Sequence, residues 1–157
     1  MLTKNFFTAG KAIFTVEPSE AFVTAKAQLG ETFHPHYTYR VDRVEMEAKG
    51  QWPAKTCYFV KALSGPDNTS DYVYLGMLDA ETGEVRLTQK SAFPATATRV
   101  LVVQRVLKAI FDGRGGQIAA AGWKVRHNGH CARCARVLTV PESIESGFGP
   151  ECAKLVA

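Results

Sequence analysis

The sequence lacks the long apolar run that a membrane-spanning helix or a secretory signal requires. No stretch approaches the roughly eighteen apolar residues of a spanning helix, and the N-terminus, MLTKNFFTAGK, has no apolar signal-peptide core. The G-x-S-x-G, H-E-x-x-H and dinucleotide-binding patterns of common enzymes are also missing. We therefore expect a soluble, cytoplasmic protein that is not an enzyme, with no catalytic residues, no membrane contact and no small-molecule substrate.

Acidic residues are scarce in one part of the chain. From Arg86 to Arg136 there are ten basic residues and a single acidic one, Asp112, which gives a net charge of +9. The rest of the chain has nine basic and fourteen acidic residues, a net charge of −5. A basic segment of this kind fits a phosphate backbone or an acidic protein surface. The alternative is a solvated face spread over several elements. The residues predicted to contact nucleic acid are Arg105, Lys108, Arg114, Lys124, Arg126, Arg133 and Arg136.

The apolar pattern predicts an α+β fold. Alternating or β-branched runs at 11–17, 37–46, 56–63, 72–78 and 84–89 indicate an antiparallel sheet of about five strands. A short helix is expected over 18–29. Residues 98–112 have helical periodicity and predict an amphipathic helix, capped by Thr98, that packs across the sheet. We therefore expect two domains, a sheet-and-helix domain at 1–113 and a small zinc-binding module at 114–157.

Three of the four cysteines fall in that module, at Cys131, Cys134 and Cys152. A C-x-x-C on a tight turn presents two thiolates to one zinc ion. Cys152 follows Gly149-Pro150, and proline favours the first turn of a helix, so Cys152 is expected near a helix N-terminus. Turn and helix together resemble a treble-clef-type zinc finger. Ordinary reduced thiols are the alternative, and Cys57 is expected to be a small buried residue.

The fourth zinc ligand is expected to be a histidine. His130 adjoins Cys131, and neighbouring residues rarely both reach one ion from a tight turn. His127 lies four residues before Cys131, and Gly129 lets the chain curl back. The predicted set is therefore His127, Cys131, Cys134 and Cys152, with one structural Zn²⁺ per chain. Thr139-Val140-Pro141-Glu142 is typical of a capping box at the start of a helix between the two halves of the site.

The part of the chain from His127 onward, which we call the cysteine segment, resembles a small domain near the C-termini of uncharacterised phage, prophage and plasmid proteins. The phrase SGPDNTSDYVYLGML, residues 64–78, is similar to the N-terminal part of such proteins. The resemblance implies a protein that acts in the cytoplasm of a bacterial host cell. The residues that match the family pattern are His127, Gly129, Cys131, Arg133, Cys134, Arg136, Leu138, Thr139, Pro141, Glu142, Ser143, Ile144, Gly147, Gly149, Pro150 and Cys152.

Two functions are compatible with these features. The first is a nucleic-acid-binding accessory protein, for DNA or RNA, that uses the basic segment. Its sheet tyrosines are candidates to stack unpaired bases, with ordinary sheet packing as the alternative; they are Tyr37, Tyr39, Tyr58, Tyr72 and Tyr74. The second, implied by the resemblance, is a protein-binding inhibitor of a host defence system, of the anti-defence or anti-CRISPR type, with a structural zinc.

Overall fold

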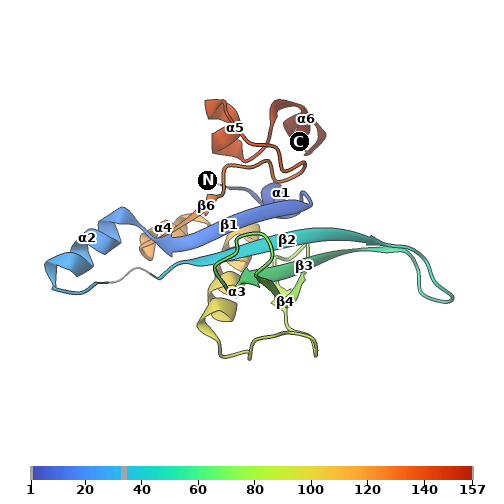
Figure 1. Cartoon of the computed structure of the whole chain (residues 1–157), viewed down its shortest axis with the longest axis horizontal. Helices are drawn as coiled ribbons and strands as arrows, with labels where there is room; N and C mark the ends of the chain where they lie inside the picture. Colours follow the sequence, from blue (N-terminus) through green and yellow to red (C-terminus); the bar gives the residue numbers. More distant parts are fainter. Residues whose placement is uncertain (1, 33–34, 157) are drawn as a thin grey trace.

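The computed structural model describes residues 2–32 and 35–156, and within them the chain forms an α+β fold around a six-stranded antiparallel sheet (Figure 1). The strands are β1 (Lys11–Pro18), β2 (Tyr37–Met46), β3 (Lys55–Leu63), β4 (Tyr72–Leu78), β5 (Val85–Arg86) and β6 (Trp123–His127). The helices are α1 (Lys4–Phe7), α2 (Glu20–Gln28), α3 (Thr98–Phe111), α4 (Gly116–Ala120), α5 (Pro141–Ser146) and α6 (Pro150–Val156). The spatial order of the strands is β5-β4-β3-β2-β1-β6. The predicted fold class is confirmed.

The sheet gains its edge strand from the C-terminal part of the chain. β6 pairs antiparallel with β1, with Phe14 opposite His127 and Pro18 opposite Trp123. The apolar pattern of the sequence predicts about five strands, and β6 is not among them. The first strand of the 114–157 segment is therefore part of the same sheet as the N-terminal strands.

Helix α3 packs against the sheet because its apolar residues recur on one side. Val100, Val103 and Leu107 are fully buried and share one hydrophobic core with Phe14 and Val41. The buried hydroxyl of Tyr39 donates to the carbonyl oxygen of Arg99 at 2.6 Å, which ties the start of α3 to β2. The predicted amphipathic helix is confirmed.

The start of α3 differs from the prediction in its cap. Thr98 is the first residue of the helix, and Ala97 occupies the N-cap position without a side-chain hydrogen bond. Pro94 and Ala97 form a turn just before the helix, in which the Ala97 N–H donates to the Pro94 carbonyl oxygen at 3.0 Å. A cap at Thr98 was therefore a wrong prediction, because the helix begins one residue earlier than the cap would require.

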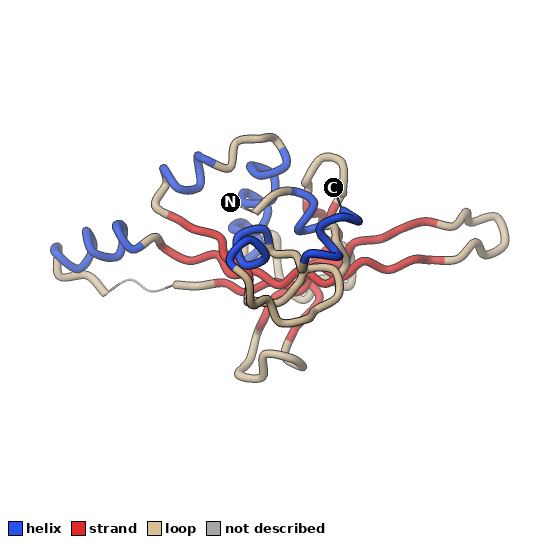
Figure 2. The backbone as a smooth tube through the Cα atoms, turned by 90° about the horizontal axis from the view of Figure 1, so that it is seen from above, coloured by secondary structure: helices blue, strands red, loops and turns tan. Residues whose placement is uncertain are grey.

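Two elements project from the sheet in opposite directions. Figure 2 shows the β2–β3 hairpin extending on one side and α2 on the other. Helix α2 has no buried residues, and the Ser19 side chain caps it by accepting from the Phe22 N–H at 3.3 Å. None of the helices in the described part of the chain has the length and apolar composition that a membrane crossing needs.

Helix α1 lies between the sheet and the cysteine segment. Its Phe7 ring packs edge-on against Phe14 of β1, with ring centroids 4.9 Å apart. Its Phe6 ring lies 6.3 Å from Phe148 in the cysteine segment. The backbone N–H of Lys11 also donates to the carbonyl oxygen of Ala132 at 2.7 Å. The cysteine segment is thus packed onto the same core as the sheet.

Candidate metal centre and cationic hollow

A small hairpin at residues 129–138, which we call the cysteine hairpin, presents the first two cysteines. The N–H of Leu138 donates to the Gly129 carbonyl at 2.8 Å, and the N–H of Cys131 donates to the Arg136 carbonyl at 2.8 Å. At its tip, the Ala135 N–H donates to the Cys131 carbonyl at 2.9 Å. Ala135 has a φ of 65°, in the left-handed region that favours glycine. This tight turn brings Cys131 and Cys134 to the same side of the hairpin.

Helix α6 presents the third cysteine. Gly147 ends α5 with a φ of 80°. Pro150 begins α6, as the sequence predicts. Cys152 therefore lies in the first turn of α6 and is buried. Pro141 stands at the start of α5 as expected, but Val140 is the N-cap and no side chain caps the helix. The predicted capping box is wrong, because Thr139 lies one residue too early to reach the first turn.

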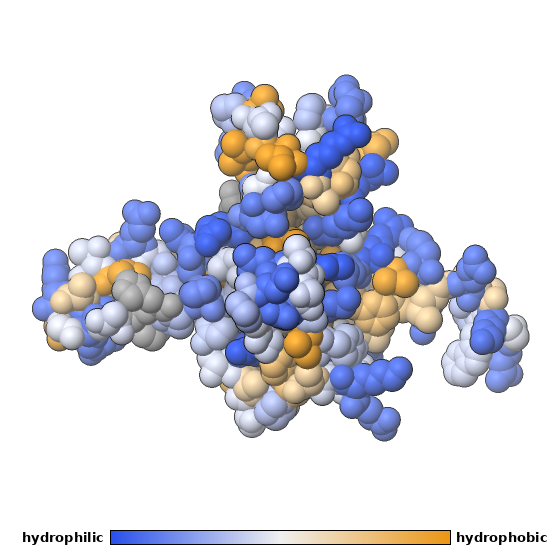
Figure 3. Space-filling model, viewed as in Figure 1, coloured by the Kyte–Doolittle hydropathy of each residue, from blue (hydrophilic) through white to orange (hydrophobic). Residues whose placement is uncertain are grey.

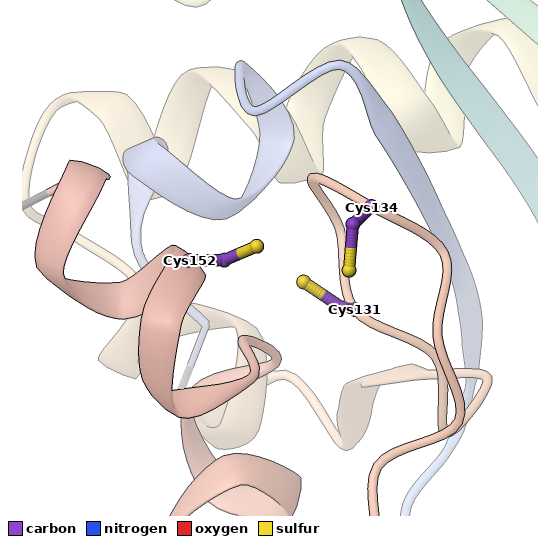
Figure 4. Close-up of side chains that lie close together, drawn as sticks. All are labelled: Cys131, Cys134 and Cys152. Atoms are coloured by element: carbon purple, nitrogen blue, oxygen red, sulfur yellow. The ribbon is translucent and has the colours of Figure 1, made fainter.

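The three sulfur atoms lie within 4.8 Å of one another and point toward a common centre (Figure 4). Tetrahedral zinc with bonds of about 2.3 Å to sulfur places neighbouring sulfurs about 3.8 Å apart. The observed spacing therefore needs only a small closure to hold a metal ion. Cys57 is not part of this cluster: it is buried in β3, and its Sγ lies 3.5 Å from Sδ of Met46.

The protein environment favours ionisation of one of these thiols. Burial opposes charge on Cys131, but hydrogen bonds from the backbone N–H groups of Cys134, Gly149 and Arg133 outweigh it and lower the pKa of Cys131 to about 7. Burial raises the pKa of Cys152, and the nearby charge on Cys131 raises it further. The thiolate of Cys131 is thus stabilised by backbone N–H groups of the hairpin turn and of Gly149, which precedes α6.

The structure does not bring His127 into the cluster. His127 ends β6, and its Nδ1 accepts from the Gly129 N–H at 2.9 Å. Its Nε2 is hydrogen-bonded to the carbonyl oxygen of Ile144, and its ring lies 6.0 Å from the Phe6 ring. His130 also points elsewhere, with Nδ1 at 3.3 Å from the Asn128 carbonyl oxygen. Three thiols are assembled here, and the fourth ligand stays a prediction.

Comparison with known protein families matches the cysteine segment. Residues 124–157 match DUF6011, a family of unknown function. Comparison with curated proteins and with solved structures found no match. The match begins inside β6 and includes all three clustered cysteines.

Three of the predicted nucleic-acid-binding residues surround a hollow of about 470 Å³ between α3, α4 and the sheet edge. Arg105 and Lys108 come from α3, and Arg114 comes from the loop before α4. The hollow has an apolar lining that includes Val102, Val106, Ala109, Ile118 and Trp123. We call it the cationic hollow.

One acidic residue, Asp112, forms ion pairs with two of the three cations around the cationic hollow. Asp112 bonds to Lys108 Nζ at 3.2 Å and to an Arg114 guanidinium nitrogen at 2.9 Å. Hydrogen bonds from Arg114 and then Lys108 hold the pKa of the Asp112 carboxyl below its ordinary value. Arg105 is exposed and makes no hydrogen bond or ion pair with the described residues. Three cations and one carboxylate leave a net positive charge at this rim.

The other four predicted residues lie elsewhere. Lys124 and Arg126 alternate with Trp123 and Val125 along β6, so they occupy the opposite face of the sheet. Both pair with Glu17, at 3.7 and 2.6 Å. Arg133 and Arg136 are exposed on the cysteine hairpin. Three of the seven predicted residues therefore line the hollow, and their role in nucleic-acid binding stays a prediction. Trp123 and Ile118 were not predicted to lie beside them, because their positions depend on how β6 and α4 pack.

The sheet tyrosines do not form a single stacking platform. Tyr39 is fully buried, and Tyr37 and Tyr58 pack against the core. Tyr74 bonds through its hydroxyl to Thr88 at 3.0 Å, and the Tyr72 ring lies under the Arg40 guanidinium at 5.8 Å. For Tyr39 the alternative, packing within the sheet, holds, because its ring is fully buried and its hydroxyl bonds to the start of α3.

Proposed function

We propose that this chain is a non-catalytic, zinc-containing accessory protein of a phage or mobile element that binds nucleic acid. The observation that carries the proposal is the convergence of Arg105, Lys108 and Arg114 on one hollow. These residues are nine positions apart in sequence at most, yet two different elements supply them. Clustered cations supply the sequence-independent part of nucleic-acid affinity by displacing counterions from phosphates.

The zinc in this proposal is structural. Cys131, Cys134 and Cys152 supply three soft ligands at a spacing that suits zinc. His127 would complete the set if its ring left the Ile144 carbonyl oxygen. Bound zinc would hold α6 against the cysteine hairpin and so preserve the packing of Phe148 on Phe6.

Direct binding to labelled oligonucleotides at low salt tests the nucleic-acid proposal. The wild-type protein should bind, and Arg105→Glu should weaken binding several-fold because it puts a negative charge at the rim. Arg86→Glu is the matched control: Arg86 lies in the same basic segment but on β5, away from the hollow. Equal losses for the two variants, or no binding by the wild type, would contradict the proposal.

Protein binding is the second candidate, and exposed apolar residues on the cysteine segment favour it. Val137, Val140, Ile144 and Leu155 are between 45% and 67% exposed. Figure 3 shows apolar surface gathered over this segment at the top of the view. Exposed apolar patches on soluble domains commonly mark interaction sites. An inhibitor of a host defence protein would use such a surface.

A pull-down from bacterial lysate separates the two candidates. For a protein partner, nuclease treatment should leave the captured protein in place, and Ile144→Asp should release it. Leu29→Asp is the control, because Leu29 is also exposed but lies beyond α2. Capture that nuclease abolishes, with Ile144→Asp unchanged, would count against protein binding.

A further inference from the structure

The cationic hollow combines two properties that duplex binding does not need. Phosphate contacts to a duplex require cations on an open surface, whereas this site has an apolar interior of about 470 Å³. That volume falls in the range of roughly 300–1,000 Å³ typical of sites for organic ligands. Apolar side chains of α3 and α4 form its sides, and Trp123 of β6 lies against them. The hollow therefore has room for a flat organic group.

The cations stand at the rim of this apolar space. Lys108 Nζ is held by the Thr82 carbonyl oxygen at 3.2 Å in addition to Asp112. Arg114 Nη1 is also 3.5 Å from the Gln117 side-chain oxygen. Two of the three cations are thus fixed in place, and exposed Arg105 is available to a ligand. A ligand that fits would have an apolar ring flanked by negative charge.

We infer that the cationic hollow takes one unpaired nucleobase of a single-stranded nucleic acid while its cations bind the flanking phosphates. This inference rests on the proposed function and narrows it to single strands. A base in a strand is a flat ring with a phosphate on either side, which matches an apolar hollow with cations from α3 and from the α3–α4 loop. A paired base is stacked inside a duplex and cannot enter. Aromatic residues such as Trp123 stabilise unpaired bases without reading their sequence.

The affinity of the wild-type protein for two oligonucleotides, one with bases and one without, tests this inference. The first is a twelve-residue oligothymidine, and the second is an abasic strand with the same number of phosphates. Electrostatic attraction is matched between them, so the difference in affinity reports the contribution of the bases. We expect the oligothymidine to bind about tenfold more tightly or better, as stacking energies per base indicate. A duplex of the same length should bind no better than the abasic strand.

Tryptophan fluorescence locates the base. The chain has two tryptophans, so Trp52→Phe leaves Trp123 as the reporter. Trp52 is 70% exposed in the loop between β2 and β3, where the substitution leaves the hollow intact. Oligothymidine should quench Trp123, and the abasic strand should not. Ile118→Glu, which puts a carboxylate in the hollow, should remove both the quenching and the base-dependent part of the affinity.

Each outcome bears on a different claim. Equal, salt-sensitive affinity for the abasic strand and the oligothymidine would overturn the inference and leave the proposed function standing. Loss of all binding at low salt would overturn both. Quenching of Trp123 by an acidic peptide containing an aromatic residue, with none by oligothymidine, would assign the hollow to a protein segment and overturn the inference as well.

Discussion

A guanidinium nitrogen of Arg133 lies 3.8 Å from the sulfur of Cys152. The contact joins the cysteine hairpin, which holds Arg133, to α6, which holds Cys152. A cation at this position favours negative charge on the sulfur, as ligands to a metal require. This contact associates Arg133 with the cluster, whereas its charge alone predicts a nucleic-acid contact.

We therefore predict that Arg133→Gln weakens metal retention. The substitution removes the positive charge beside Cys152, so metal loss to a chelator should be faster, by several-fold. Arg136→Gln is the matched control, because Arg136 is exposed on the same hairpin and makes no side-chain hydrogen bond or ion pair with the described residues. The same rate of metal loss in both variants would refute the role of Arg133.

The purified protein should contain about one zinc per chain. Cys134→Ser or Cys152→Ser should lose most of it and destabilise α6, because ligand binding is coupled to folding. Cys57→Ala should retain the metal, since Cys57 is buried in β3 beside Met46. Elemental analysis measures the metal content. A preparation without metal, or a requirement for Cys57, would show that the assignment is wrong.

His127 should contribute more to metal retention than His130. His127→Phe keeps a ring next to Phe6 but removes both nitrogens, and with them the hydrogen bonds to Gly129 and Ile144. We expect faster loss of metal to a chelator in His127→Phe than in His130→Phe, measured at a temperature where both metal-free variants are folded. The reverse order would identify His130 as the ligand, and no effect of either would indicate a three-thiolate site.

Gly147 should tolerate no side chain. Its φ is +80°, and a Cβ there would lie 2.5 Å from the Phe6 ring. The left-handed conformation and the overlap should together cost roughly 2 kcal/mol or more in the free energy of unfolding. Gly149→Ala is the control, because a Cβ at Gly149 meets nothing within 4 Å. Denaturant unfolding measures the free energy of unfolding of Gly147→Ala and of Gly149→Ala. Equal values for the two variants would contradict the packing of α1 on the cysteine segment.

Local patterns predicted most of the elements, because the strands and α3 have strong periodicity. The thiol cluster was also predictable, since C-x-x-C and Gly-Pro-x-Cys each imply a local backbone shape. The pairing of β6 with β1 was not recognised, although Trp123-Lys124-Val125-Arg126 alternates as a strand does. Nothing local in five residues specifies a partner more than a hundred positions away.

The cationic hollow is another feature that local sequence patterns predict only in part. Arg105 and Lys108 share one helix and were named from charge alone, but the apolar lining depends on how α3, α4 and β6 pack. The orientation of His127 is another such case. Its distance from Cys131 in sequence suggested a ligand, whereas pairing with Phe14 in the sheet directs its ring toward Phe6 and Ile144.

The salt dependence of oligonucleotide binding tests the central claim most directly. Each phosphate neutralised on a single strand contributes about −0.7 to the slope of log affinity against log salt concentration. Two phosphates, one on either side of the bound base, predict a slope of roughly −1.4. Arg105→Gln should make that slope less steep by about 0.7, while Arg86→Gln leaves it unchanged. The absence of measurable DNA or RNA binding at low salt, or an unchanged slope in Arg105→Gln, would contradict the account.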